Sequence, residues 1–250
     1  YTKQVEEMNA VAAKHPELVY CMDFNQRTNP LYKKVKDLID SGDLGEMTRV
    51  IWIVTDWYRS QSYYDQGGWR ATWDGEGGGV LLNQNPHNLD LWQWMCGIPK
   101  RVKSQVYYGK HRNIEVEDDL YALVEYENGA TGCYITTVGD APGTNRLEID
   151  GTNGKIVVEN NELTFYRLRT PEPEFNATYK GGLGKPEVWE CKIPIKGTYT
   201  SHPGIINNFC DCILKGAKPI APGAEGIRGL QISNAIHLSS WLNGEWVNIP

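Results

Sequence analysis

Residues 77–91 (GGGVLLNQNPHNLDL) combine three glycines with polar side chains that suit proton transfer. Glycine lets the backbone turn or pack where a side chain would not fit. If Asn83 opens a helix, Pro86 falls in its first turn, where a missing N–H is harmless. Asn83, His87 and Asp90 then lie near one helix face, because residues three and four apart are neighbours. Histidine transfers protons near neutral pH, so this face is a candidate catalytic site. The alternative is a capping asparagine beside a satisfied core histidine.

Aromatic residues with a polar group are unusually frequent, with nine tryptophans and fourteen tyrosines against four phenylalanines. Many of them lie between residues 52 and 94. Such rings suit a ligand that offers an apolar face beside hydroxyl groups, as a sugar does. The alternative, for any single ring, is packing in the core or at a subunit interface.

Composition narrows the class of protein. The 250 residues carry a net charge of -6 and a pI near 5.4, so nucleic-acid and anionic-membrane partners are not expected. No apolar run approaches the roughly 20 residues of a membrane span. The six cysteines are scattered, and Cys210-Asp211-Cys212 lacks zinc spacing, so we expect reduced thiols, no metal site and a cytoplasmic location.

The first 45 residues alternate between helix and strand patterns. Helical spacing covers residues 2–15, the apolar run 18–22 is typical of a buried strand, and Asn29-Pro30 opens a second helix that ends near Gly42. This order is what remains of a doubly wound domain cut late in its sequence. No glycine-rich dinucleotide fingerprint follows any of these elements.

Strand patterns dominate from residue 46 onward, with helices expected at about 83–96, 203–215 and 224–242. Asn128-Gly129 and Asn153-Gly154 are strong hairpin signals. Together these patterns predict an α+β fold: an open, mostly antiparallel sheet covered by helices on one face, preceded by the helix–strand–helix remnant. The expected strands are 47–56, 100–108, 120–126, 130–137, 146–150, 155–159, 163–168 and 188–195.

Several short motifs then follow one another in a characteristic order. They are residues 23–27 (DFNQR), 38–46 (LIDSGDLGE), Trp69-Arg70, 77–90, 150–154 (DGTNG) and the ending 209–250. Their order and spacing resemble the Gfo/Idh/MocA family of NAD(P)-dependent sugar and polyol oxidoreductases over essentially the whole chain.

The resemblance implies that a dinucleotide-binding domain for NAD or NADP precedes residue 1. In the family that domain ends in Glu-Lys-Pro, whose Lys is usually the acid/base partner, and neither this Lys nor the glycine fingerprint is present here. We therefore expect residues 1–45 to be a remnant of that domain. Residues 46–250 are expected to form the substrate-binding and oligomerisation domain, and the chain by itself to be inactive.

The resemblance also assigns roles within the glycine segment. Family members commonly carry Asp, then His four residues later, then Asp three residues after that, and here Asn83 takes the first place. Asparagine can hydrogen-bond a hydroxyl but cannot act as a base. We expect proton transfer by His87 with the absent Lys and positioning by Asn83. Asp90 is expected to be structural, either orienting His87 or capping within the helix.

Four further residues are candidates for substrate binding. Asn25 and Arg27 follow the expected strand, where ligand crevices of open α/β sheets form, and Arg27 could contact substrate or cofactor. Trp69 and Arg70 precede the glycine segment and could line a sugar pocket. The alternatives are a surface salt bridge for Arg27 and loop packing for Trp69 and Arg70.

The implied activity is hydride transfer between a carbinol carbon and a nicotinamide, with proton removal by the protein. The substrate class is a sugar, sugar derivative or polyol. Two alternatives stay open: an NAD-dependent glycoside hydrolase of the same family, and a non-catalytic carbohydrate-binding or assembly domain.

A sheet covered on one face leaves its other face to be hidden. Val124, Tyr126, Tyr134 and Ile135 are expected to supply an apolar outer surface, and family members commonly bury that face against a second subunit. We therefore expect a homo-oligomer, a dimer or tetramer, formed through the sheet.

Overall fold

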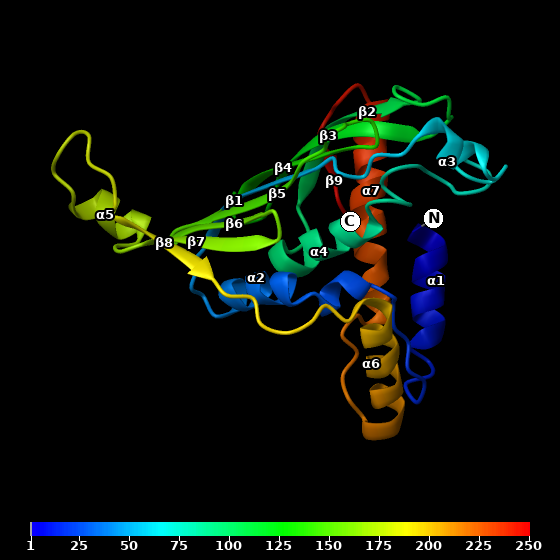
Figure 1. Cartoon of the computed structure of the whole chain (residues 1–250), viewed down its shortest axis with the longest axis horizontal. Helices are drawn as coiled ribbons and strands as arrows, with labels where there is room; N and C mark the ends of the chain where they lie inside the picture. The colour runs from blue at the N-terminus through cyan, green and yellow to red at the C-terminus, as the bar shows by residue number, and fades with distance from the viewer. Residues whose placement is uncertain (1) are drawn as a thin grey trace.

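The computed structural model describes residues 2–250 and is built on one nine-stranded sheet, drawn in Figure 1. The strand order is β8-β7-β6-β5-β1-β4-β3-β2-β9. Only β1 and β4 pair in parallel; the other neighbours are antiparallel. The strands are β1 Met47–Val54, β2 Arg101–Tyr108, β3 Glu117–Glu125, β4 Thr131–Thr137, β5 Asn145–Gly151, β6 Gly154–Glu159, β7 Glu162–Leu168, β8 Val188–Ile193 and β9 Val247–Asn248.

Both hairpins predicted from Asn-Gly pairs are confirmed. Gly129 closes the turn between β3 and β4 with a φ of 85°. Gly154, with a φ of 149°, follows the turn between β5 and β6. Both φ values lie in the region that side chains with a Cβ rarely adopt, so glycine is the residue that suits each turn.

Helices cover one face of the sheet, as Figure 1 shows for α2, α4 and α7. The helix predicted to begin at Asn29-Pro30 is confirmed. The Asn29 side chain caps it by accepting a hydrogen bond from Leu31 N at 3.0 Å. The helices are α1 Thr2–Ala12, α2 Pro30–Asp40, α3 Gln61–Asp65, α4 Pro86–Cys96, α5 Glu172–Thr178, α6 Ser201–Lys215 and α7 Gly226–Trp241, with short 3₁₀ turns η1 Asn25–Thr28 and η2 Gly223–Glu225.

An aromatic group forms the centre of the core between sheet and helices. Trp52 of β1 stacks on Trp92 of α4, and Tyr134 of β4 packs edge-on against both rings. The two indole N–H groups are satisfied: Trp52 donates to Asn145 at 3.1 Å and Trp92 to Tyr126 at 2.5 Å. Part of the tryptophan enrichment therefore serves packing, and it holds α4 against the middle of the sheet.

The prediction of a strand at residues 18–22 is wrong. This run makes one isolated bridge, between Cys21 and Pro222, and forms no ladder among residues 2–250. A strand needs a partner along its length, and Pro222 has no N–H to donate. The remnant is therefore α1, an extended segment, η1 and α2. In addition, the regions expected to be loops, 57–79 and 170–186, contain α3 and α5.

The prediction of which residues lie on the outer face of the sheet is also wrong for three of the four residues. Val124, Tyr126 and Tyr134 are buried on the helix-covered side, and only Ile135 lies half-buried with the opposite set. Side chains alternate between the two faces of a strand, so an error of one residue moves the whole set to the wrong face. The open face instead carries Tyr121 and Leu123, which are 47% and 48% exposed.

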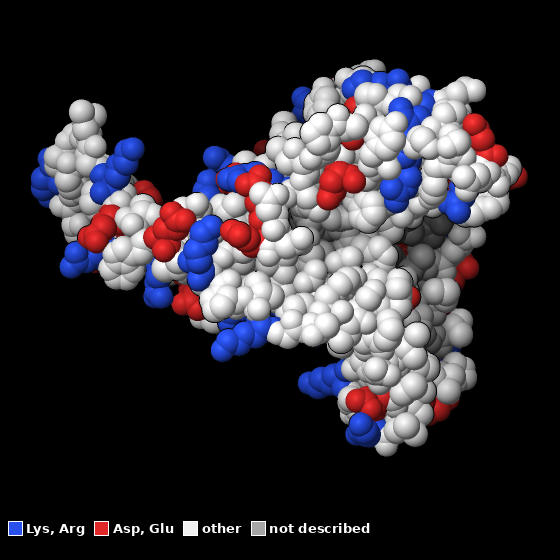
Figure 2. Space-filling model, viewed as in Figure 1, with Lys and Arg blue, Asp and Glu red and all other residues white. Residues whose placement is uncertain are grey.

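Charge is unevenly spread over the face seen in Figure 2. Lys, Arg, Asp and Glu gather toward the end that carries α5 and β8, at the tip of α6 and toward the end that carries α3, while the centre has few. Within residues 2–250, no helix combines the length and apolar character needed to cross a membrane.

Candidate functional site

The glycine segment is anchored by a buried carboxylate. Glu117 accepts from Gly79 N at 2.8 Å and from Leu81 N at 3.0 Å, and its own carbonyl accepts from Val80 N at 3.0 Å. A Cβ on Gly79 would lie 2.0 Å from the Glu117 carbonyl oxygen, so the close approach requires glycine there. The segment before α4 therefore has a fixed path.

The start of α4 differs from the expected one. The helix begins at Pro86, with Asn85 as the preceding residue, so Asn83 lies in the turn before it. Asn85 does not cap the helix; it donates to Thr136 Oγ1 at 2.7 Å and accepts from Tyr134 Oη at 3.0 Å. These bonds to β4 hold the chain outside the helix at Asn85. The prediction that one helix face carries all three polar residues is wrong for Asn83.

His87 lies in the first turn of α4 and is half-buried. Its ring stands edge-on to Phe24, with centroids 6.2 Å apart. Its Nδ1 is buried and makes no hydrogen bond to any described residue. Burial lowers the pKa of His87; Asp90 and Asp23 oppose this shift and His202 adds to it. His87 is therefore neutral at pH 7 and can accept a proton.

Asp90 pairs with Arg27. Arg27 Nε donates to Asp90 Oδ2 at 2.8 Å and Nη2 to Oδ1 at 2.6 Å, and each side chain is 1% exposed. Arg27 Nη1 also donates to Glu225 at 2.7 Å and to the Ile220 carbonyl at 3.2 Å. Burial raises the pKa of Asp90, and the Arg27 bonds oppose that shift. Asp90 also accepts from Gln93 Nε2 at 2.9 Å, so both of its carboxylate oxygens bind protein groups.

Asn25 brings a second unpartnered polar atom to this region. Its Nδ2 donates to Ser201 Oγ at 3.1 Å and lies 3.0 Å from His202 Nε2. Its Oδ1 is buried and has no partner among the described residues. His202 Nδ1 in turn lies 2.7 Å from Asp23 Oδ2. Sequence reasoning missed His202, because it sits at a helix start without any flanking motif.

Trp69 and Arg70 form a separate group with Asn83. Arg70 donates to Tyr63 Oη at 2.8 Å, and its guanidinium lies 4.7 Å from the Tyr63 ring centroid and 4.6 Å from that of Trp69. Tyr63 Oη donates to Asn83 Oδ1 at 3.3 Å, and Asn83 Nδ2 donates to Glu76. The Tyr63 hydroxyl thus links Arg70 to Asn83 by two hydrogen bonds.

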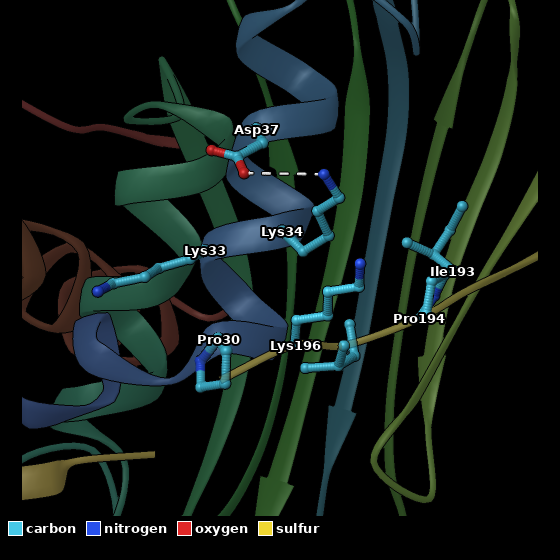
Figure 3. Close-up of a pocket in the computed structure, with 8 residues that line it drawn as sticks. Pro30, Lys33, Lys34, Asp37, Ile193, Pro194 and Lys196 are labelled. Carbon is cyan, nitrogen blue, oxygen red and sulfur yellow. Dashed lines mark ion pairs between the residues drawn. The ribbon is translucent and has the colours of Figure 1, made fainter. Parts of the chain in front are cut away.

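Several cavities lie away from these residues, among them one of about 670 Å³ beside β6 and β7. A groove of about 480 Å³ separates α2 from the segment after β8 and is shown in Figure 3. It is lined by Pro30, Lys33, Lys34, Asp37 and residues 193–196. Its Lys34 faces Asp37 at 4.0 Å, and Lys33 points away from the sheet. None of the predicted site residues lines this groove, although Arg70 lines a smaller cavity beside α3.

A buried acid–histidine contact lies behind the glycine segment. Glu117 Oε2 is 3.6 Å from His237 Nε2, and His237 Nδ1 is 3.0 Å from Tyr108 Oη. Burial raises the pKa of Glu117 to about 7 and lowers the pKa of His237 to about 4. Both shifts favour uncharged side chains, which is the expected response to removal from water.

Comparison with known proteins places this geometry in a family. Residues 32–157, half of the chain, match the family described as GFO/IDH/MocA C-terminal domain. The chain belongs to the Gfo/Idh/MocA family. As a Gfo/Idh/MocA protein it has the α+β fold expected from the sequence, an open and mostly antiparallel sheet with helices on one face.

Named relatives are dehydrogenases. Levoglucosan dehydrogenase of Pseudarthrobacter phenanthrenivorans is 24% identical over 280 residues, covering 98% of this chain and 71% of the relative. The scyllo-inositol 2-dehydrogenase (NAD(+)) of Bacillus subtilis is 20% identical over 260 residues, covering 97% of this chain and 67% of the relative. A solved structure of the WlbA dehydrogenase from Chromobacterium violaceum, in complex with NADH and UDP-GlcNAcA, superposes with a TM-score of 0.80 at 27% identity. That match covers 100% of this chain and 68% of the WlbA chain.

The Arg27–Asp90 pair yields a first prediction. Asp90→Asn leaves the buried guanidinium without its main counter-charge and should lower the free energy of unfolding by about 3–5 kcal/mol. Asp40→Asn, which breaks an exposed pair with Lys36, should change it by about 0.5 kcal/mol or less. Urea denaturation followed by circular dichroism measures both. Equal losses would contradict a special role for the buried pair.

His237 yields a prediction on pH. Its folded pKa of about 4 lies below the ordinary 6.5, so the unfolded chain binds more protons between these values and stability rises with pH there. Between pH 4 and 6.5, the free energy of unfolding should rise by about 3 kcal/mol more in wild type than in His237→Gln. Glu117 has the opposite slope up to pH 7, so the difference between variants is the quantity to measure.

His15→Gln is the matched control for that experiment, because His15 is exposed. Urea titrations at several pH values should give this variant the wild-type profile. A His237→Gln profile parallel to wild type from pH 4 to 6.5 would show that His237 titrates normally in the folded protein.

Proposed function

We propose that this chain forms the substrate side of an NAD(P)-dependent oxidoreductase that acts on a sugar, a sugar derivative or a polyol. The observation that carries the proposal is a pair of buried polar atoms without partners, His87 Nδ1 on α4 and Asn25 Oδ1 on η1. Buried polar atoms are normally hydrogen-bonded, so two such acceptors near Phe24 are consistent with a ligand that brings hydroxyl groups. The names of the relatives point to the same substrate class.

The dinucleotide itself does not fit these residues. In residues 2–250, no strand leads through a glycine-rich fingerprint turn into a helix, which is the usual cradle for its pyrophosphate. We therefore assign residues 1–45 to the end of a cofactor-binding domain and residues 46–250 to the substrate domain, and place the pyrophosphate outside the described residues. The cofactor, NAD or NADP, would supply the hydride chemistry.

The chain's own contribution is to hold a hydroxyl group and take its proton. His87 suits this role because burial keeps it neutral at pH 7 with Nδ1 free to accept. Asn25 Oδ1 would accept a hydrogen bond from a second hydroxyl. Asn83 would position the substrate, since its amide cannot act as a base.

The remaining candidates take supporting and lining roles. The Arg27 guanidinium is enclosed by protein partners, so we assign it to holding η1 against α4. Trp69 is half exposed and lies against Arg70, so these two would form a wall for the apolar face of a sugar.

The central test is activity of the full gene product on a panel of sugars and polyols with NAD and NADP. His87→Ala should lower turnover by about a hundredfold or more, the usual contribution of a general acid or base. Initial rates by cofactor absorbance measure it, with circular dichroism to confirm folding. An unchanged rate in a folded variant would make His87 a packing residue.

Asn83 provides a contrasting variant. Asn83→Ala should raise KM more than it lowers kcat, because the amide binds substrate without moving a proton. Asn83→Asp keeps the acceptor for Tyr63 but loses the donor to Glu76 and sets two carboxylates together, so it should also raise KM. Steady-state kinetics on the best substrate of the panel separate the two effects, and a pure loss of kcat in Asn83→Ala would contradict the positioning role.

We also propose a homo-oligomer formed through the open face of the sheet. Tyr121 and Leu123 are exposed there at neighbouring outward positions of β3, and a groove of about 360 Å³ with Ile51, Cys133 and Trp246 in its lining lies alongside. Light scattering at micromolar concentration should give at least a dimer. Leu123→Lys should shift the mass toward the monomer, whereas Leu183→Lys, at an exposed loop position, should leave it unchanged.

A further inference from the structure

His202 forms a three-residue relay with Asp23 and Asn25. Its Nδ1 lies 2.7 Å from Asp23 Oδ2 and its Nε2 lies 3.0 Å from Asn25 Nδ2. The Asp23 carboxylate accepts a hydrogen bond from the N–H group at Nδ1, which leaves Nε2 without a proton. Nε2 is then the acceptor for the amide N–H of Asn25. The two partners thus fix both the ring orientation and the tautomer of His202.

The backbone beside His202 is held in an uncommon conformation. Ser201 has a φ of 49°, in the left-handed region that residues with a Cβ rarely adopt. Its Oγ accepts from Asn25 Nδ2 at 3.1 Å, and Thr28 Oγ1 contacts its carbonyl at 3.5 Å. Residues of η1 therefore hold the first turn of α6, and such strain concentrates at functional sites.

The relay lies beside His87. Phe24, between Asp23 and Asn25 in sequence, packs its ring against the His87 ring. The titratable groups whose charges act on the pKa of His87 are Asp90 from α4, Asp23 from the segment before η1, and His202 from α6. Asp90 and Asp23 raise the pKa of His87 against the larger effect of burial, and His202 lowers it.

The two histidines differ in their access to water. His87 Nδ1 is buried, whereas the side chains of His202 and Asp23 are 56% and 57% exposed. Oxidation of a carbinol releases one proton for each turnover. A proton taken up by a buried imidazole must leave again before the next turnover, and a positive charge is costly there. His202 offers an exposed imidazole that is paired with a carboxylate, Asp23.

We propose that His202, paired with Asp23, passes the proton between His87 and solvent. This inference rests on the proposed function. The N–H bond at His87 breaks as an N–H bond forms at His202 Nε2, through one bridging water or substrate hydroxyl. His202 then carries both ring protons and Asp23 balances its charge. Release of the Nε2 proton to water restores the bond from Asn25.

The activity test uses His202→Gln and Asp23→Asn in the full gene product, with His15→Gln as the matched control. His15 also pairs with a carboxylate, Glu17, at 3.1 Å on the surface. Turnover should fall by about tenfold to a hundredfold in His202→Gln, less in Asp23→Asn, and not at all in His15→Gln. Added imidazole should restore turnover of His202→Gln in proportion to its concentration, and should not affect wild type.

Rescue by a small proton carrier separates a relay from a structural role, because a distorted site is not repaired by imidazole. Wild-type turnover in a folded His202→Gln variant would overturn the proposal. A loss of turnover that does not depend on imidazole concentration would also overturn it.

A second readout does not depend on activity. Titration of the His87 ring by NMR should show a raised pKa in His202→Gln, because His202 lowers it in wild type, and a lowered pKa in Asp23→Asn, because Asp23 raises it. His15→Gln should match wild type. If no sugar or polyol is oxidised, the proposed function fails, and this titration still decides whether His202 and His87 are coupled. Identical His87 titrations in all four proteins would overturn the relay.

Discussion

The buried pair between Arg27 and Asp90 is the interaction on which the geometry of the site depends. It joins η1 to α4, and the second branch of the Arg27 guanidinium reaches Glu225 beside α7. A buried charge pair of this kind adds little net stability, since desolvation offsets most of the attraction. The pair instead fixes the relative position of η1 and α4, because burying either charge without the other is costly. The start of α4, and therefore His87, is held at a defined distance from the segment that carries Asn25.

Hydrogen bonds to the sheet hold the other side of the start of α4. Glu117 of β3 binds the backbone at Gly79 and Leu81, and Asn85 binds Thr136 and Tyr134 of β4. The turn that carries Asn83 is thus held between two strands and a helix. Rigid elements position catalytic groups better than free loops do, and here a loop gains that rigidity from buried hydrogen bonds.

Features decided by neighbouring residues could be predicted from the sequence. The hairpins at Asn128-Gly129 and Asn153-Gly154 and the Asn29 cap depend on a few adjacent backbone angles, and each is found where expected. Features decided across the fold were missed. The start of α4 depends on Asn85 meeting β4, the run at 18–22 lacks a strand to pair with, and the outer face of β3 depends on a one-residue alternation. His202 joins the region of Asn25 only because η1 and α6 meet in space.

The parallel pairing of β1 with β4 has a consequence for how this chain folds. β1 is the middle of the sheet, yet its neighbours β4 and β5 come after residue 130, with Val50 opposite both Gly132 and Ile149. During synthesis, β1 leaves the ribosome before both of its partners and waits unpaired until most of the intervening chain has followed. Closing such long loops slows folding and leaves an apolar strand exposed to other chains. Assistance by a chaperone would matter most in the interval before β4 emerges.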